Sequence, residues 1–159
     1  FKQNNSYVTS LENKFTVSLH LKNASKGDVE SNANFPVWKD FIHSNDIQFL
    51  LIGSDIVPED IKCLPNVTSL QDEGLSILEQ LTCIQQSSAF MGMASGPANV
   101  AILSKIPYAI FKHPLHHADI MQKEIGDADH YDFAEQNQNI LRKHETSELL
   151  SLFLSAVYK

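Results

Sequence analysis

Short apolar runs recur along most of this chain, and polar or amphipathic segments separate them. Some runs alternate apolar and polar side chains, as a strand with one covered face does, and others are nearly continuous. The run at 47–52 is of the continuous kind, which suits a parallel strand covered on both faces. The strands that these runs predict lie at residues 14–22, 47–52, 66–70, 89–93 and 108–112, with a further candidate at 130–133.

Helical periodicity lies between the predicted strands. Leu75, Leu78, Leu81 and Ile84 recur every three residues and predict an amphipathic helix up to about residue 87. Trp38 is expected to pack beside an apolar helical stripe, with a ligand-facing position as the alternative. The predicted helices cover residues 35–45, 75–87, 97–106 and 118–125, with one turn after Pro58 and a final helix from Glu145 or Thr146.

This alternation of strands and helices predicts an α/β fold around a mostly parallel sheet. At 159 residues and 43% hydrophobic content, the chain fits one domain with a proper core. Residues 1–13 are polar and lack a period, so they are interpreted as a tail or linker, and residues 14–159 as the domain. The polar segment 23–34 is a long loop, and loops of that length are usually functional or mobile.

Composition narrows the classes of partner. The net charge is −7 and there is no basic block, which argues against nucleic-acid binding. No run of eighteen apolar residues is present, so no membrane span is predicted. Cys63 and Cys83 form no CxxC pair and are expected to be reduced thiols. The chain begins with Phe1 and no signal-peptide pattern precedes it, so we expect a cytoplasmic fragment or a trimmed chain.

The segment 89–111 predicts a strand, a tight turn, a helix and another strand. Ser95 suits the N-cap of that helix, and Pro97 suits its first turn, where its missing N–H would be unpaired anyway. Free N–H groups and the helix dipole would then point above the strand end, which favours phosphate. An ordinary crossover without a ligand is the alternative interpretation.

The carboxyl ends of the predicted strands carry most of the chemistry. In open α/β sheets, ligands bind outside these ends. Three of the five ends bring a cation or a helix N-terminus, so the sequence predicts an anionic ligand, and a diphosphate fits best in size. The side chains at the five ends are His20 and Lys22, then Gly53, Ser54 and Asp55, then Gln71 and Asp72, then Ser95 and Gly96, and finally Lys112 and His113.

Other chemistries are less well supported. His113, His116 and His117 suggest zinc, but Pro114 interrupts the helix that would present them, and only Asp119 adds a ligand at suitable spacing. A serine nucleophile would require Gly-x-Ser-x-Gly, which the turn lacks. Neither Gly-x-Gly-x-x-Gly nor a Walker loop occurs, which disfavours a dinucleotide dehydrogenase or a P-loop kinase. We therefore predict no metal and no cofactor.

The segment from Phe90 to Pro107, FMGMASGPANVAILSKIP, resembles the donor-binding motif of GT-B glycosyltransferases. In the heptosyltransferase-like branch, a strand ending in Ile-Gly-x-x-Ser-Gly leads into a helix. The first strand end, Ser-Leu-His-Leu-Lys, is similar to the His-Val-Arg strand end of fucosyltransferase-like enzymes, with Lys22 in the place of arginine. The segment 133–138 and the final helix also look similar, so the resemblance covers about residues 14–157. One departure is Ala94, where many relatives have Asp.

The resemblance implies half of a GT-B fold: a Rossmann-like open, mostly parallel sheet with helices on both faces. This half would be the C-terminal, nucleotide-sugar-binding domain. The residues that would hold the donor diphosphate are His20, Lys22, Ser95, Gly96, Pro97, Ala98 and Asn99, although Pro97 has no N–H to give. The candidates for contacts with the base or the sugar are Gln71, Asp72, His113 and Glu135.

The function so implied is binding of a nucleotide sugar for transfer to an unknown acceptor. An N-terminal domain of the same protein would bring the acceptor and the catalytic base, so the isolated domain is expected to be inactive. Two alternatives remain at this stage. One is a non-catalytic Rossmann-like module that binds a partner or an unrelated anion, and the other is half of a nucleotide-sugar epimerase.

Overall fold

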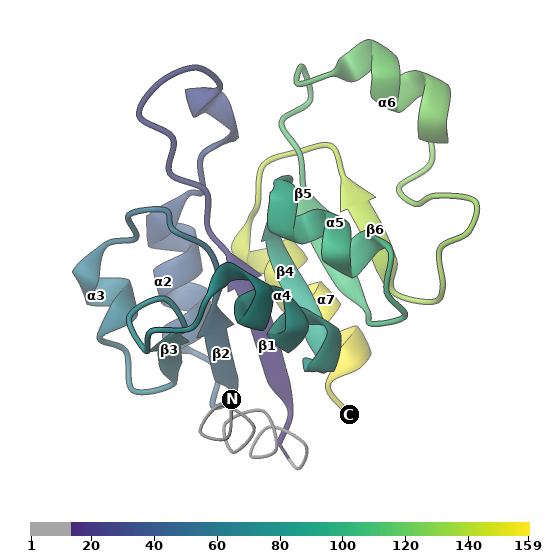
Figure 1. Ribbon diagram of the computed structural model, residues 1–159. Coiled ribbons are helices and arrows are strands. Elements are labelled where there is room, and N and C mark those ends of the chain that lie inside the picture. The colour runs from purple at the N-terminus through teal and green to yellow at the C-terminus, as the bar shows by residue number, and fades with distance from the viewer. Residues whose placement is uncertain (1–13) are drawn as a thin grey trace.

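A computed structural model describes residues 14–159, and the predicted tail at 1–13 lies outside the described residues. Six strands form one sheet in which every neighbouring pair is parallel (Figure 1). Their order, β3-β2-β1-β4-β5-β6, is that of a doubly wound α/β fold. The strands are β1 (Thr16–His20), β2 (Gln48–Leu51), β3 (Val67–Ser69), β4 (Ala89–Met93), β5 (Tyr108–Phe111) and β6 (Gln138–Leu141).

Helices cover both faces of the sheet, as the resemblance implied. The buried side chains of α2, α3 and α7 belong to one hydrophobic cluster, and those of α4, α5 and α6 belong to another. The predicted α/β fold with a parallel sheet and helices on both faces is therefore confirmed. The helices are η1 (Val29–Ser31), α2 (Phe35–His43), α3 (Glu59–Lys62), α4 (Ile77–Gln86), α5 (Gly96–Ile102), α6 (Ala118–Ile125) and α7 (Ser147–Val157).

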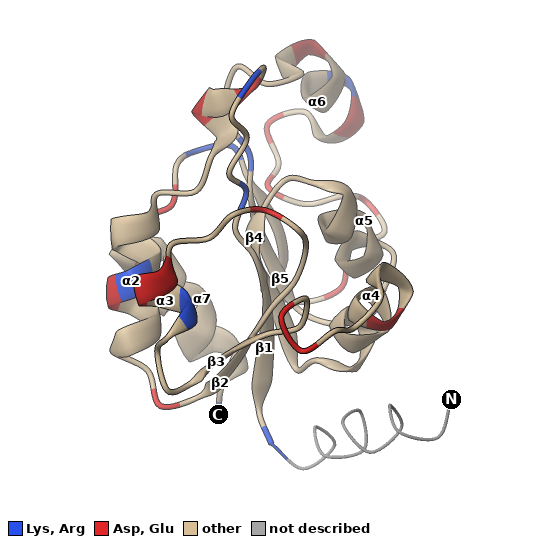
Figure 2. Ribbon diagram, turned by 60° about the vertical axis from the view of Figure 1, so that its left-hand side comes forward, with Lys and Arg blue, Asp and Glu red and all other residues tan. Residues whose placement is uncertain are grey.

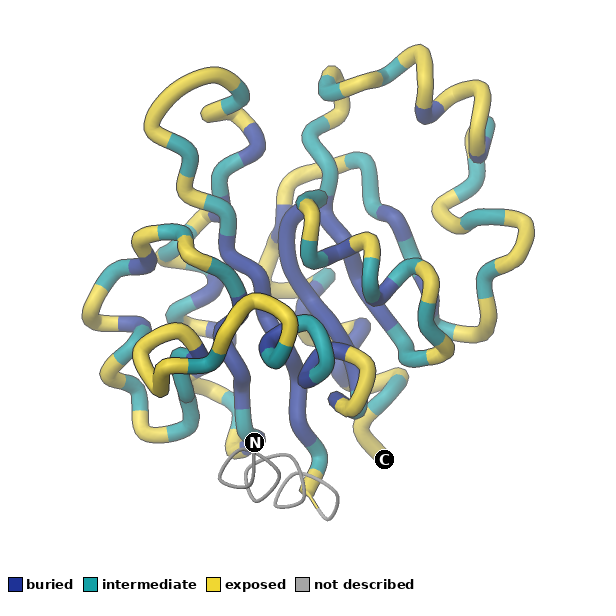
Figure 3. Tube along the Cα trace, viewed as in Figure 1, coloured by how far each residue is buried: buried dark blue, intermediate teal, exposed yellow. Residues whose placement is uncertain are grey.

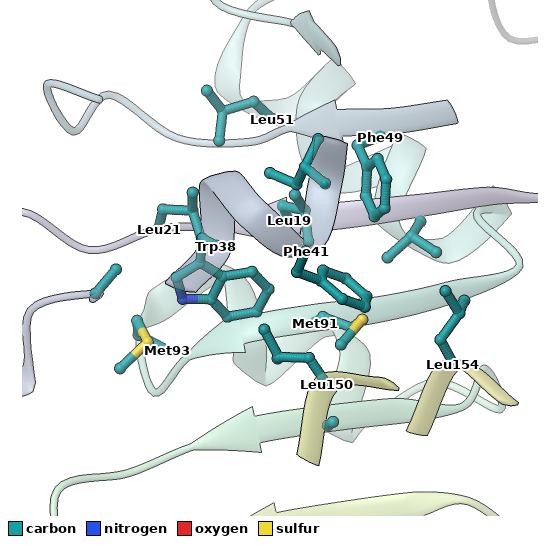
Figure 4. Close-up of a cluster of buried hydrophobic side chains, with 14 of the residues drawn as sticks. Leu19, Leu21, Trp38, Phe41, Phe49, Leu51, Met91, Met93, Leu150 and Leu154 are labelled. Carbon is teal, nitrogen blue, oxygen red and sulfur yellow. The ribbon is translucent and has the colours of Figure 1, made fainter. Parts of the chain in front are cut away.

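Trp38 lies at the centre of the first cluster. Its side chain is fully buried, and its ring meets those of Phe41 and Phe111 edge-on at centroid distances of 6.2 Å. Figure 4 shows it between the β-strands and Leu150 of α7. The interpretation of Trp38 as a core residue is therefore confirmed, and a ligand-facing role is excluded.

The central strands carry the deepest burial. Every residue of β1 and of β4 is buried (Figure 3), because each strand is paired on both edges and covered on both faces. The polar members of β1 are Thr16, Ser18 and His20. Polar side chains at such positions must find partners or serve a site.

The candidate strand at 130–133 is wrong. The sixth strand lies at β6, where only Ile140 and Leu141 are apolar. It is an edge strand that pairs with β5 alone, so its sequence needs little hydrophobic content. Tyr131 and Phe133 instead lie in the preceding loop, with their rings stacked at 5.1 Å.

The helix predicted from residue 75 begins later. Ser76 caps α4: its hydroxyl accepts a hydrogen bond from the Glu79 N–H, and the Glu79 carboxylate accepts one from the Ser76 N–H. The leucines do not share one helix face, because each three-residue step falls about 60° short of a full turn. Leu78 is therefore 72% exposed, and Gln80 is buried on the same face as Ile84. The helix predicted over 97–106 is shorter than expected, because α5 ends at Ile102.

Candidate functional site

The end of β1 places His20 against the loop after β2. The imidazole side chain is 5% exposed, and its Nε2 lies 2.9 Å from Oδ2 of Asp55. The other carboxylate oxygen, Oδ1, accepts a hydrogen bond of 2.8 Å from the N–H of Asn23. A carboxylate only accepts, so the shared hydrogen belongs to Nε2 of the ring. Asp55 thus fixes both the His20 ring and the start of the 23–34 loop.

Two glycines make room for His20. Gly92 of β4 has φ +150°, and a Cβ there would collide with the His20 carbonyl oxygen. Gly53 has φ +98°, and a Cβ there would lie 2.7 Å from Cδ2 of the His20 ring. Both positions therefore require glycine on conformational and steric grounds.

His20 does not supply the positive charge that was expected at the end of β1. Burial lowers the pKa of the ring below its ordinary 6.5, and the attraction of Asp55 only partly offsets this. The ring is therefore mainly neutral at pH 7. Positive charge at this edge comes from lysines instead.

A cavity of about 390 Å³ opens beside His20. Lys22 and the turn at the start of α5 both line it, so the structure brings together five of the seven residues predicted to hold a diphosphate. It is lined by His20, Lys22, Gly53, Ser54, Asp55, Ile77, Ala94, Ser95, Gly96 and Pro97.

Ser95 is the N-cap of α5, as predicted, with Pro97 in the first turn. Its side chain makes no capping hydrogen bond, and its hydroxyl oxygen is buried without a partner among residues 14–159. The first N–H groups of a helix have no intrahelical acceptor. This turn therefore presents the Ser95 hydroxyl and the first N–H groups of α5 as donors for which no acceptor is found among residues 14–159.

A second cavity, of about 230 Å³, lies on the other side of Ser95. The remaining two predicted residues, Ala98 and Asn99, line it together with Lys112 and His116. Burial lowers the pKa of Lys112, although nearby Asp28 and Glu124 act against this. The rest of the lining is mainly apolar, so this cavity suits a ring that carries a polar group. Its other lining residues are Ala94, Ser95, Ile102, Ile110, Met121, Tyr131 and Ile140.

Gln71 and Asp72 line a third cavity, of about 160 Å³, which shares Gly53, Ser54 and Asp55 with the first. Asp72 is engaged there, since its carboxylate lies 2.8 Å from Nζ of Lys62. Both residues therefore lie next to the first cavity, at the same edge of the sheet.

Two predicted contacts lie apart from these cavities. The His113 ring meets that of His144 at 5.2 Å, and His113 lines none of the three cavities. Glu135 is exposed and precedes the amino end of β6, so the structure places it toward the opposite edge of the sheet. Glu135 was selected from a sequence resemblance, which does not say at which edge of the sheet a residue lies.

Two further polar residues at this edge were missed. Gln80 of α4 accepts a 2.9 Å hydrogen bond from the Gly53 N–H and donates one of 2.9 Å to the Leu75 carbonyl. Asp28 of the long loop pairs with Lys22 at 2.9 Å. The length of the 23–34 loop was the only signal for Asp28, and nothing in the sequence singled out Gln80.

Within residues 14–159, no group of three or more His, Cys, Asp or Glu side chains is arranged to hold a metal ion. The same residues contain no helix that is long and apolar enough to cross a membrane. Cys63 and Cys83 are both free thiols.

Comparison with known proteins gives a fold-level match. No protein-family model and no curated protein sequence matches this chain. Among solved structures, E. coli heptosyltransferase WaaC with ADP superposes with a TM-score of 0.56 at 12% identity, covering 96% of this chain and 48% of that one. WaaC with ADP-2-deoxy-2-fluoro heptose gives 0.56 at 11% identity, covering 96% and 47%.

At such low identity the match shows the fold. The chain has the Rossmann-like α/β fold of about half of a GT-B glycosyltransferase, and it spans about half the length of the heptosyltransferase chains that it matches. The predicted resemblance to this class is confirmed at that level. What the chain binds is a separate question.

Proposed function

We propose that this chain is the donor-binding half of a glycosyltransferase and that it binds the diphosphate of a nucleotide sugar at the carboxyl edge of its sheet. The observation that carries the proposal is the 390 Å³ cavity that Lys22, Ser95 and Gly96 line together. Phosphate oxygens accept hydrogen bonds from groups of the kinds found here: a hydroxyl, backbone N–H groups and a lysine ammonium. The heptosyltransferase with a similar fold was solved with ADP, which supports a nucleoside diphosphate as the ligand class.

The diphosphate would be held by groups of two kinds. The N–H groups of Gly96, Ala98 and Asn99 would bind its oxygens directly. Lys22 would supply charge, without the bidentate geometry of an arginine. As the donor bond breaks, negative charge grows on the departing diphosphate, and these preorganised groups would stabilise it without a metal ion.

The other parts of the donor would use the neighbouring cavities. Gln71 and Asp72 face the 160 Å³ cavity, and Asn99 and Lys112 face the 230 Å³ cavity. Both join the first cavity through shared residues, so a ligand anchored at Ser95 could extend either way. ADP is the first nucleotide to test, since both matched structures hold an adenosine diphosphate group.

Transfer to an acceptor would need more than this chain. We propose that an N-terminal domain of the same protein brings the acceptor and the catalytic base, so that the chain alone binds donor but does not transfer the sugar. A cytoplasmic location stays a prediction of the sequence.

Isothermal titration with ADP, UDP, GDP and CMP tests the proposal. One nucleoside diphosphate is expected to bind, and Lys22→Met should weaken it about tenfold, as loss of a charge-assisted hydrogen bond does. Lys105→Met is the matched control, because Lys105 is exposed and lies before β5, at the other edge of the sheet. Absence of binding at millimolar ligand, or equal weakening by both substitutions, would overturn the proposal.

A further inference from the structure

One carboxylate joins two loops above the sheet. Oδ2 of Asp28 lies 2.9 Å from Nζ of Lys22 and 3.3 Å from Nε2 of His116. The other ring nitrogen of His116, Nδ1, lies 3.5 Å from Nζ of Lys112. These four side chains form a continuous row, which we call the rim cluster.

The two loops follow strands that are separated by β4 in the sheet. The 23–34 loop follows β1, and the 112–117 loop follows β5. Both rise beyond the carboxyl ends of the strands (Figure 1), and Figure 2 shows Lys and Arg segments beneath them. The base of the first loop is closed by its own contacts, in which the side-chain amide of Asn32 bonds both the N–H and the C=O of Ala24. Asp28 lies beyond that closure and reaches across to His116.

The charges of the rim cluster do not balance. Two lysines flank one carboxylate, Lys22 directly and Lys112 through the His116 ring. Burial and Lys112 lower the pKa of His116 below its ordinary 6.5, so this ring contributes an N–H rather than a full charge at pH 7. The three residues of the ion pairs are partly shielded, with side-chain exposures of 19% for Lys22, 27% for Asp28 and 28% for His116. The Asp28 carboxylate therefore lies where one ammonium group and one ring N–H converge, with a second ammonium group behind the ring. A phosphoryl group carries more charge and more acceptor oxygens than this carboxylate does.

The rim cluster also joins the 390 Å³ and 230 Å³ cavities described above. Lys22 lines the 390 Å³ cavity, Lys112 and His116 line the 230 Å³ cavity, and Ser95 lines both. Ser95, whose hydroxyl has no partner among residues 14–159, is thus shared by the cavity of Lys22 and the cavity of Lys112 and His116. A diphosphate with one phosphoryl group at Ser95 could reach the rim cluster with the other.

We infer that Lys22, Lys112 and His116 form an anion subsite that Asp28 occupies in the free protein, and that a phosphoryl group of the donor takes this place by displacing the Asp28 carboxylate. The inference rests on the proposed function for the identity of the ligand. The exchange is feasible because partly exposed ion pairs are weak, whereas hydrogen bonds from charged donors to phosphate are strong. Asp28 then lowers the affinity of the free protein for its own ligand.

The test is titration of the chain with inorganic pyrophosphate and with ADP, comparing Asp28→Asn with Glu30→Gln. Both substitutions remove one negative charge from the same loop, but Glu30 is exposed and lies beyond the rim cluster contacts. Asp28→Asn is expected to tighten pyrophosphate binding about fivefold, as loss of two weak competing ion pairs would. Glu30→Gln should change it less than twofold, and Lys112→Met should weaken it.

Hydrogen exchange without ligand gives a second readout. Asp28→Asn should speed amide exchange in both the 23–34 and the 112–117 segments, and Glu30→Gln in neither. Equal pyrophosphate affinities for the two variants, or faster exchange confined to 23–34, would overturn the inference even if ADP binds. If no nucleoside diphosphate binds while pyrophosphate still prefers Asp28→Asn, the anion subsite stands and the proposed function fails.

Discussion

His20 and Asp55 join the carboxyl ends of neighbouring strands through one contact of 2.9 Å between Nε2 and Oδ2. His20 ends β1, and Asp55 follows β2 by a few residues. The same carboxylate holds the N–H of Asn23. One acidic side chain therefore sets the position of the buried ring and of the start of the loop that follows Lys22 and carries Asp28.

Asp55→Ala is expected to destabilise the fold by about 1–3 kcal/mol, because it leaves the buried Nε2–H of His20 and the N–H of Asn23 without this acceptor. Urea unfolding followed by circular dichroism measures the change. Ser54→Ala is the control, since Ser54 is exposed beside it and should stay near the wild type. A wild-type midpoint for Asp55→Ala would show that the contact contributes little.

Stability should fall at mildly acidic pH through His20. Its pKa is lowered in the fold by burial, so below about pH 6.5 the unfolded chain binds the proton more readily than the folded one. The stabilisation that neutral His20 gives the folded state is therefore complete above pH 6.5. It is lost as the pH falls through the lower pKa that His20 has in the folded protein. Thermal unfolding between pH 7.5 and 5 should show a shallower decline for His20→Gln than for the wild type. His43→Gln, at an exposed position, should keep the wild-type slope.

Three glycines at the same edge should respond differently to alanine. Gly92→Ala is expected to cost about 3 kcal/mol or more, because its φ of +150° disfavours a side chain and a Cβ would collide with the His20 backbone. Gly53→Ala should also be destabilising, through the His20 ring. Gly96→Ala should stay within about 0.5 kcal/mol of the wild type, because no atom lies within 4 Å of the added Cβ. Denaturant midpoints rank the three, and a large loss at Gly96 would contradict the geometry.

Ser95→Ala should separate binding from folding. Its hydroxyl has no partner among the described residues and makes no capping bond, so stability should change by less than about 0.5 kcal/mol. If the hydroxyl contacts the diphosphate, ADP affinity should fall about fivefold. Titration and urea unfolding on one preparation measure both. Unchanged affinity would remove Ser95 from the proposed site.

Gln80→Ala should destabilise the protein by about 2 kcal/mol, since it leaves the Gly53 N–H and the Leu75 carbonyl without their side-chain partner. Gln85→Ala removes an exposed glutamine from the same helix and should have little effect. Equal unfolding midpoints for the two variants would show that the buried amide is dispensable.

The sequence pattern was sufficient for most of the sheet. The five predicted strands are present. Four of them, β1, β2, β4 and β5, are central strands, whose apolar runs are buried on both faces and leave a clear signal. The edge strand β3 still shows β-branched Val67 and Thr68, whereas the edge strand β6, which was missed, begins with Gln138 and Asn139. In α4, the three-residue spacing of the leucines drifts around the helix, so the buried face includes Gln80 and Ile84 but not Leu78.

For the site, the sequence by itself determined which strand ends would meet: in a parallel sheet, the ends carrying His20, Lys22 and Ser95 must lie at one edge. Only the tertiary structure decided what each group does there. Burial beside Asp55 leaves His20 mainly neutral, and the folding of two distant loops brings Asp28 between Lys22 and His116. The reason is physical: strand order follows from local pattern and topology, whereas charge state and ion pairing depend on desolvation and on distances between segments far apart in the chain.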